Sequence, residues 1–427
     1  MKEQTSNDES SLFSKKVSRR DMLKTAGIGG VGVVIGASGL GGMLSLSDSK
    51  AKGQQTNDTV PFYGPHQAGI TTEAQDNLYF ASLEVTSEKR SDLIQLFKDW
   101  TEAAAQMTSG KPVGEASSNR SMPPKDTGEV EELSPSNLTI TFGVGPSLFT
   151  KNGKDRFGLK SKQPAELKDL PSFSLDALEE SWSGGDICIQ ACADDLQVAF
   201  HAVRNLVRIG RGKTIIHWAQ TGFQRTKKAD SKKSTPRNLF GFKDGTVNPK
   251  KSSEMNQHVW VKPGDGPSWL AGGSYMVVRR IQMYIEVWDR TTLKEQENTF
   301  GRHRDSGAPL GMKNEFDTVD ENPKDENGNR IIPENSHMIL SRGDGTNKIL
   351  RRPYSYADGM DPKTGSFNAG LLFICFQRSP SKQFIPIQER LSKNDKLNEY
   401  IIHRGSAIFA CLPGVKKGGY IGETLFG

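Results

Sequence analysis

Three residues of different types stand out because each lies in a setting that suits a ligand. Asp244 is flanked by glycines in the run 241–249 (GFKDGTVNP). Glycines let the backbone approach a flat ligand closely, and they hold the aspartate on an exposed turn. His337 follows a long polar stretch, and Arg351 comes 14 residues later. An acid, an imidazole and a guanidinium separated by irregular backbone could occupy the two faces of a macrocycle.

Other patterns in the chain do not meet the requirements of the sites they resemble. The run 211–214 (RGKT) ends like a phosphate-binding loop, but Val207 stands where the motif needs its first glycine. The run 325–330 has the wrong ligand spacing for calcium and is expected to form a turn. The chain has no C-x-x-C-H motif, which excludes covalent c-type haem. A lone histidine is more often structural than a ligand, so the case for His337 depends on its neighbours.

The first 51 residues have the features of a signal that directs export. Arg19 and Arg20 form a twin-arginine pattern within the run 18–24 (SRRDMLK), and a glycine-rich apolar stretch follows. The run 49–51 (SKA) offers small residues at the positions that a signal peptidase needs. An N-terminal membrane anchor is the alternative, but six glycines between residues 27 and 39 weaken both helix formation and hydrophobicity. We expect residues 1–51 to be a twin-arginine signal peptide and the protein to act outside the cytoplasm, in the cell envelope, the periplasm or the medium.

A signal peptide at residues 1–51 affects how the glycine-rich run 27–32 and the net charge are interpreted. The run 27–32 (GIGGVG) matches the dinucleotide-binding fingerprint, but it follows the twin-arginine pattern rather than a strand, so that assignment fails. The full chain of 427 residues carries a formal charge of +6, and removal of seven basic and five acidic residues with the signal lowers it to +4. A charge this dilute predicts no nucleic-acid partner. Twin-arginine export carries proteins that have already folded, often around a cofactor.

The four cysteines are expected to be buried thiols. Cys188 and Cys192 lie four residues apart in a strand-like run, which would separate them by about 13 Å, beyond the reach of a disulfide. Cys375 and Cys411 also lie in apolar, strand-like runs.

The mature chain predicts an α+β protein made of two tandem ferredoxin-like (split βαβ) domains with antiparallel sheets. Residues 52–70 form a polar leader, residues 71–238 the first domain and residues 239–427 the second. The basic run 225–238 is expected to be a solvated linker rather than a site for an anionic partner. The insertion 300–347 is rich in polar residues and glycine, which is typical of a functional or disordered loop. In the first half we expect strands at 78–85, 138–144, 186–193 and 214–223 and helices at 91–107 and 195–208. In the second half we expect strands at 274–281, 370–377 and 407–412 and helices at 284–297 and 383–391.

With these motifs in place, the sequence resembles the dye-decolorising (Dyp-type) haem peroxidases, in particular their exported, iron-uptake-associated branch, the EfeB-type deferrochelatase/peroxidases. The resemblance covers essentially the whole mature chain and the twin-arginine leader. The motifs that carry it are the runs 241–245 (GFKDG, the family's G-x-x-D-G), 300–304 (FGRHR), 336–337 (SH), 349–352 (ILRR) and 370–373 (GLLF).

The resemblance implies one non-covalent haem b per chain, bound mainly by the C-terminal half. It further implies that His337 is the proximal iron ligand, Asp244 the distal acid–base residue and Arg351 the distal arginine. The residues implied to line the haem or to reach a propionate are Gly245, Thr246, Val247 and Arg342.

Physical chemistry supports these roles separately from the resemblance. A peroxidase must take a proton from one oxygen of the peroxide and return it to the other, so that water leaves, and one carboxylate can do both. An aspartate, which ordinarily titrates near pH 4, remains a base in acid, whereas an imidazole would be protonated there. A guanidinium such as that of Arg351 stabilises the charge that develops on the departing oxygen. A carboxylate that accepts a hydrogen bond from His337 Nδ1 would increase electron donation to iron, and Glu399 is the preferred candidate, with Asp395 second.

We therefore expect an exported haem peroxidase that uses hydrogen peroxide to oxidise dye-like or phenolic donors and is linked to iron acquisition. The iron-related step would be either the release of iron from haem or the oxidation of ferrous iron for a permease system. The alternative is a haem-binding or iron-delivery protein with incidental peroxidase activity. Because ferredoxin-like sheets often associate, we also expect a homo-oligomer.

Overall fold

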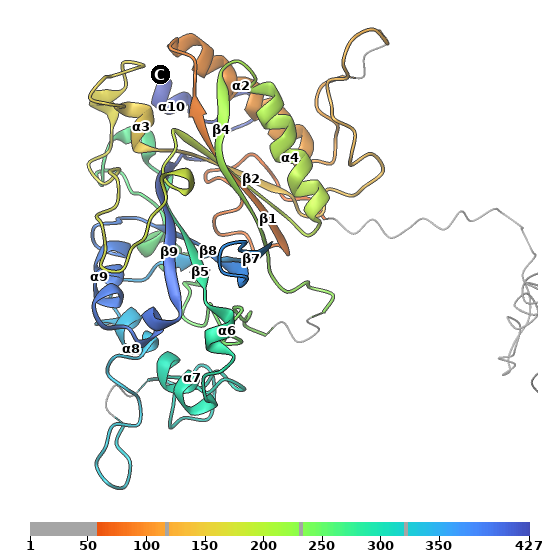
Figure 1. Ribbon diagram of the computed structural model, residues 1–427. Helices are drawn as coiled ribbons and strands as arrows, with labels where there is room; N and C mark the ends of the chain where they lie inside the picture. Colours follow the sequence, from red (N-terminus) through yellow and green to blue (C-terminus); the bar gives the residue numbers. More distant parts are fainter. Residues whose placement is uncertain (1–57, 116–118, 230–233, 320–322) are drawn as a thin grey trace, which may run out of the picture. The chain divides into compact units, whose positions relative to one another are not determined.

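Two helices packed on an antiparallel sheet make up the first half of the fold. The computed structural model describes residues 58–115, 119–229, 234–319 and 323–427 (Figure 1). The predicted signal peptide and residues 52–57 of the predicted leader therefore lie outside the described residues, whereas the rest of the leader is described. The strands run in the order β2-β3-β1-β4, as a split βαβ unit requires. The elements of this half are β1 (Asn77–Val85), α2 (Arg90–Thr108), β2 (Thr139–Val144), α3 (Pro146–Phe149), β3 (Ile187–Ala193), α4 (Leu196–Ile209) and β4 (Thr214–Phe223), with short 3-10 helices η1 (Lys160–Lys162) and η2 (Glu180–Trp182).

The sequence signals for these elements are confirmed. Leu93, Leu96, Phe97 and Trp100 of α2 are buried, as the helical spacing of the apolar residues predicts. Asp195 caps α4, since its side chain accepts hydrogen bonds from the backbone N–H groups of the second and third helical residues.

The second half repeats the layout with additional elements. Its four long strands run in the order β9-β5-β8-β7, which is the same arrangement as in the first half. Strand β7 and helices α5 and α8 were not predicted, and the helix expected at 284–297 is divided into two short helices. The elements are α5 (Ser252–His258), η3 (Ser268–Leu270), β5 (Ser274–Met283), α6 (Ile285–Trp288), α7 (Leu293–Phe300), α8 (His337–Arg342), β6 (Leu350–Arg351), β7 (Tyr354–Met360), β8 (Phe367–Gln377), α9 (Phe384–Asn394), η4 (Lys396–Glu399), β9 (Ile401–Cys411) and α10 (Glu423–Phe426).

The two sheets pair with each other along both edges. Strand β2 pairs with β9 through two residue pairs, and β4 pairs with β7 at Phe223 and Ser355. A shared core of Phe80, Trp218, Met276, Phe376 and Phe409 fills the space between them. The described strands thus form one continuous antiparallel sheet, and the boundary expected between the two domains stays a prediction.

Close packing of β5 against β8 depends on a glycine. A Cβ atom placed on Gly370 would lie 1.9 Å from the backbone oxygen of Ile281, so no larger residue fits without moving a strand. The four cysteines are buried and free, as predicted. Among the described residues, no helix combines the length and the apolar character needed to cross a membrane.

Candidate active site

His337 opens helix α8, inside a stretch that the sequence predicts to be a loop. Ser336 precedes it as the N-cap residue. Nδ1 of His337 lies 2.6 Å from Oδ2 of Asp395. Burial disfavours the imidazolium, but the charge of Asp395 and the hydrogen bond to it outweigh burial and raise the pKa of His337. Because Nδ1 is engaged by the carboxylate, Nε2 is the ring nitrogen that can bind a metal.

The carboxylate partner of His337 is Asp395 rather than the preferred candidate, Glu399. Asp395 is the N-cap residue of η4, where its Oδ1 accepts a hydrogen bond of 2.9 Å from the backbone N–H of Leu397. This cap directs its buried carboxylate toward His337, with only 2% of the side chain exposed. Glu399 closes the same short helix on its exposed side. The N-cap position therefore fixes the Asp395 carboxylate toward His337, whereas Glu399 at the other end of η4 has no such constraint on its direction.

Asp244 and Arg351 form an ion pair across two segments far apart in the sequence. Nη1 of Arg351 lies 2.6 Å from Oδ1 of Asp244. The backbone N–H of Asp244 donates to the oxygen of Pro236 at 2.7 Å. Gly245, directly after it, has a φ of +119°, which favours glycine. The turn therefore presents the Asp244 carboxylate to Arg351.

Asn248 holds the backbone of Arg351 and was not among the residues predicted from the sequence. Its Nδ2 donates to the backbone oxygen of Arg351 at 2.7 Å, and its Oδ1 accepts from the backbone N–H of Arg351 at 3.1 Å. Strand β6, which carries Arg351, is two residues long and gains this second support beyond its pairing with β8. The only signal in the sequence is that Asn248 belongs to the same glycine-flanked run as Asp244.

Arg351 and its neighbour Arg352 have different environments. Successive residues of a strand point to opposite faces. Arg352 is buried and donates to the backbone oxygen of Thr72 and to the side chain of Gln75 in the first half of the chain. Arg352 thus fastens the N-terminal segment to the sheet, and Arg351 is the arginine that faces Asp244.

A cavity of about 760 Å³ lies beside this ion pair, within the range of about 300–1,000 Å³ common for small-molecule and cofactor sites. Asp244, Gly245 and Arg351 line it, together with Asn248 and Glu315. His337 is not one of the lining residues, but the charges of Arg351 and Asp244 act on its pKa, so the three groups lie within electrostatic reach of one another.

The remaining predicted cofactor contacts have other neighbours. Thr246 donates to Oε1 of Glu315 at 3.0 Å, and the side chain of Val247 is exposed to solvent. Arg342 ends helix α8 and donates to the backbone oxygen of Val319 at 3.2 Å. None of the three belongs to the residues that line the cavity, and their predicted contacts with haem stay predictions.

The donor set of this site suits haem. A histidine whose Nδ1 is held by a buried carboxylate is the usual form of an axial iron ligand with strong electron donation. An aspartate and an arginine beside a cavity within electrostatic reach of that histidine can exchange a proton with a small oxygen ligand and stabilise its charge. Within the described residues, three or more histidine, cysteine or carboxylate side chains do not gather at any point to hold a free metal ion.

The fold and this site define a haem-dependent oxidoreductase, and comparison with known sequences gives the family. The Dyp-type peroxidase N-terminal model matches residues 67–224, and the C-terminal model matches residues 235–416. The chain belongs to the Dyp-type peroxidase family and is a haem peroxidase.

Individual members of the family are similar to this chain over most of its length. The chain is 38% identical over 414 residues to a deferrochelatase of Yersinia pestis bv. Antiqua (strain Nepal516), with 93% of each chain covered. It is 38% identical over 426 residues to a deferrochelatase of Escherichia coli (strain K12), with 96% of each covered. Ferric DtpA from Streptomyces lividans superposes with a TM-score of 0.80 at 36% identity, covering 86% of this chain and 97% of that one.

Replacement of Asp395 by asparagine should weaken haem binding. The variant keeps the size of the side chain but removes the charge that supports His337, and loss of such an outer partner typically costs about 10- to 100-fold in metal affinity or activity. Titration of the haem-free protein with haem, followed by absorption, measures the change. Glu399→Gln is the matched control and should bind haem like the wild type; the reverse order of effects would contradict the assignment.

Proposed function

We propose that the protein uses hydrogen peroxide to oxidise dye-like or phenolic donors and that it serves iron acquisition outside the cytoplasm. The observation that carries the proposal is the contact of 2.6 Å between Asp244 and Arg351 beside the cavity, within electrostatic reach of the His337–Asp395 pair. Haem, when bound, supplies the two electrons that reduce the O–O bond of the peroxide.

The side chains around the cavity move the proton and stabilise the charge. The Asp244 carboxylate takes a proton from one peroxide oxygen and delivers it to the other, so that water departs. Arg351 holds Asp244 in place and stabilises the negative charge on the departing oxygen. Asp395 orients the His337 ring through Nδ1, so that Nε2 would be the atom that holds the iron of bound haem and donates strongly to it.

The iron-related part of the proposal rests on the relatives. Proteins that are 38% identical over nearly the full chain carry the name deferrochelatase. We propose that this chain likewise releases iron from haem. The second candidate, a haem or iron carrier with incidental peroxidase activity, needs only His337 and an apolar slot. The paired Asp244 and Arg351 favour redox chemistry over simple carriage. A partner permease system and self-association of the chain stay predictions.

Asp244→Asn should slow the reaction with peroxide by about 10²- to 10⁴-fold, because the site loses its proton carrier while it keeps its shape. Stopped-flow absorption of the haem-loaded protein after mixing with peroxide measures this step, with the haem content determined in parallel. The exposed carboxylate of Asp325 provides the control variant, Asp325→Asn. A rate for Asp244→Asn near that of the wild type would show that another group carries the proton.

Incubation with haem under reducing conditions should yield iron-free protoporphyrin, identified by its fluorescence and mass. His337→Ala should abolish this product, because the iron of bound haem loses its protein ligand. If haem remains unchanged while peroxide turnover is intact, the protein is a peroxidase without chelatase activity.

Export depends on the run 18–24, and we propose that the twin arginines are its required feature. Replacement of Arg19 and Arg20 by lysine keeps the charge and should retain the protein in the cytoplasmic fraction. Replacement of Lys15 and Lys16 by arginine is the control and should leave export intact. Export of the double lysine variant at the wild-type level would contradict the proposal.

A further inference from the structure

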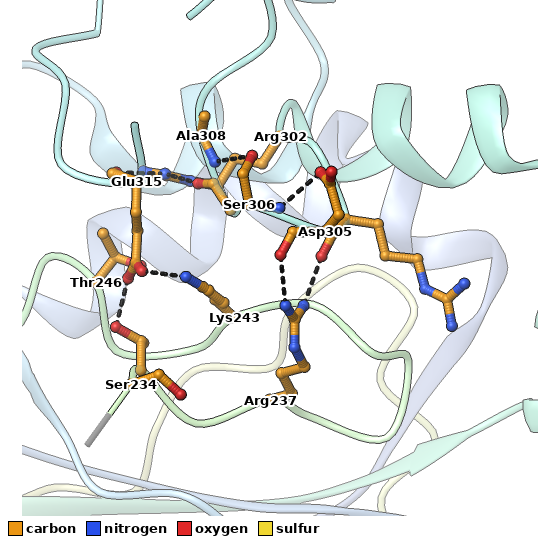
Figure 2. A network of polar contacts seen from close by, with 12 residues as sticks. Ser234, Arg237, Lys243, Thr246, Arg302, Asp305, Ser306, Ala308 and Glu315 are labelled. Atoms are coloured by element: carbon orange, nitrogen blue, oxygen red, sulfur yellow. Dashed lines mark hydrogen bonds and ion pairs between the residues drawn. The ribbon is translucent and has the colours of Figure 1, made fainter. Parts of the chain in front are cut away.

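A carboxylate from the long insertion contacts the turn that carries Asp244 at several points. Glu315 lies between α7 and α8, and 9% of its side chain is exposed. Its Oε2 accepts a hydrogen bond of 2.5 Å from Nζ of Lys243, and its Oε1 accepts one of 3.0 Å from the hydroxyl of Thr246. The hydroxyl of Thr235 also donates to Oε1. Figure 2 shows Glu315 with Lys243 and Thr246 beside it.

The backbone of Glu315 is itself fastened. Nη1 of Arg302 donates to the backbone oxygen of Glu315 at 3.1 Å and to that of Gly307 at 2.6 Å. Burial lowers the pKa of Arg302; the charge of Glu315 opposes this shift and that of Arg351 adds to it. Arg302 therefore holds two parts of the insertion together, around Gly307 and Glu315.

Two further contacts interlock the insertion with the Asp244 turn. A Cβ atom on Gly307, which has a φ of +75°, would lie 2.5 Å from Cδ of Lys243, so the lysine stem passes directly over this glycine. Arg237 donates to the backbone oxygens of Arg304 and Asp305 at 2.5 and 2.6 Å. Figure 2 shows Arg237 directed at Asp305. Arg237 belongs to the basic run that the sequence predicts to be a solvated linker; its side chain is exposed to solvent, and its guanidinium also binds the backbone of the insertion.

Glu315 is ionised more readily than an ordinary glutamate. Burial alone would raise the pKa of its carboxyl, but hydrogen bonds from Lys243, Thr235 and Thr246 outweigh burial and lower it. The anion thus accepts three hydrogen bonds at once, which an amide oxygen with the same shape can do only more weakly.

From this geometry we propose that Glu315 is a positioning residue for Asp244. Lys243 and Thr246 lie on either side of Asp244, so Glu315 holds the chain immediately before and shortly after the proton carrier. Gly245 leaves this turn flexible, and the short contact between Asp244 and Arg351 needs both partners to be held. This role of Glu315 rests on the proposed role of Asp244 as proton carrier. Through Glu315, the insertion would contribute to catalysis by holding Asp244 in place.

The test compares Glu315→Gln with Glu326→Gln, which changes an exposed carboxylate of the same insertion. The first readout is hydrogen exchange of the haem-loaded protein in peptides that contain residues 236–248. We expect faster exchange there in Glu315→Gln, including the amide of Asp244, and wild-type exchange in Glu326→Gln. The second readout is the rate of the peroxide step, which should fall by about 10- to 100-fold in Glu315→Gln through misplacement of Asp244. The KM for the donor and the haem content should not change.

Lys243→Met separates positioning from a general contribution to stability. If Glu315 acts through Lys243, the two single variants and the double variant should slow the peroxide step by similar factors rather than multiply. If Glu315→Gln does not fold, Thr246→Val removes one contact and should give a smaller effect in the same direction. Wild-type exchange and wild-type peroxide rates in Glu315→Gln would overturn the inference. A slow Asp244→Asn beside a normal Glu315→Gln would reject only the positioning role of Glu315. A normal Asp244→Asn would instead reject the proposed role of Asp244 as proton carrier, on which the positioning role rests.

Discussion

The contact between Asp244 and Arg351 is the constraint that the rest of the site must satisfy. It joins residues 107 positions apart, and both side chains are mostly shielded from solvent, with 15% and 24% of their surfaces exposed. A partly buried charge pair contributes little net stability, but loss of one partner leaves the other charge uncompensated. Because the pair adds so little to folding by itself, its geometry has to be supplied by its surroundings. Asn248 holds the arginine, and Pro236 and Glu315 hold the turn of the aspartate.

The repeated sheet explains why these surroundings can be stable. Two ferredoxin-like halves pair along both edges and share a core, and within the second half β8 has β5 on one side and β6 and β7 on the other. This strand is the support for the two-residue strand that carries Arg351. Residues 70–74 of the first half line one side of the cavity. Arg352 holds this segment against the sheet through hydrogen bonds to Thr72 and Gln75. Asp244, Arg351 and His337 thus all lie in the second half, and residues of the first half help to enclose the cavity.

The sequence predicts the long elements well and the short ones poorly. Helix α2 has apolar residues at a strict helical spacing, and Asp195 is a clear cap before α4, so both could be recognised locally. Strand β7 was missed because its second half is exposed and contains Asp358 and Gly359, which do not alternate as a half-buried strand should. Helix α8 has only six residues inside a polar insertion, too few for a periodic pattern.

Site residues whose contacts join distant parts of the chain are also hard to predict from the sequence. His337, Asp244 and Arg351 could be named from their motifs, and the structure brings Asp244 and Arg351 together. The sequence does not show which carboxylate contacts His337, because Asp395 and Glu399 lie at the two ends of the same short helix and only the fold shows which end is next to the histidine. Glu315 had no local signal and Asn248 had only its place in the run that contains Asp244, since their partners lie 72 and 103 residues away.

The central proposal is that Nε2 of His337 would bind the haem iron and that Asp244 and Arg351 would lie on the opposite face of the haem. An anomalous difference map at the iron absorption edge, from crystals of the haem-loaded protein, tests it most directly. The account predicts one peak per chain, within bonding distance of His337 Nε2, and a porphyrin plane that separates His337 from the Asp244–Arg351 pair. A peak bound to a different side chain, or a porphyrin with all three residues on one face, would contradict it.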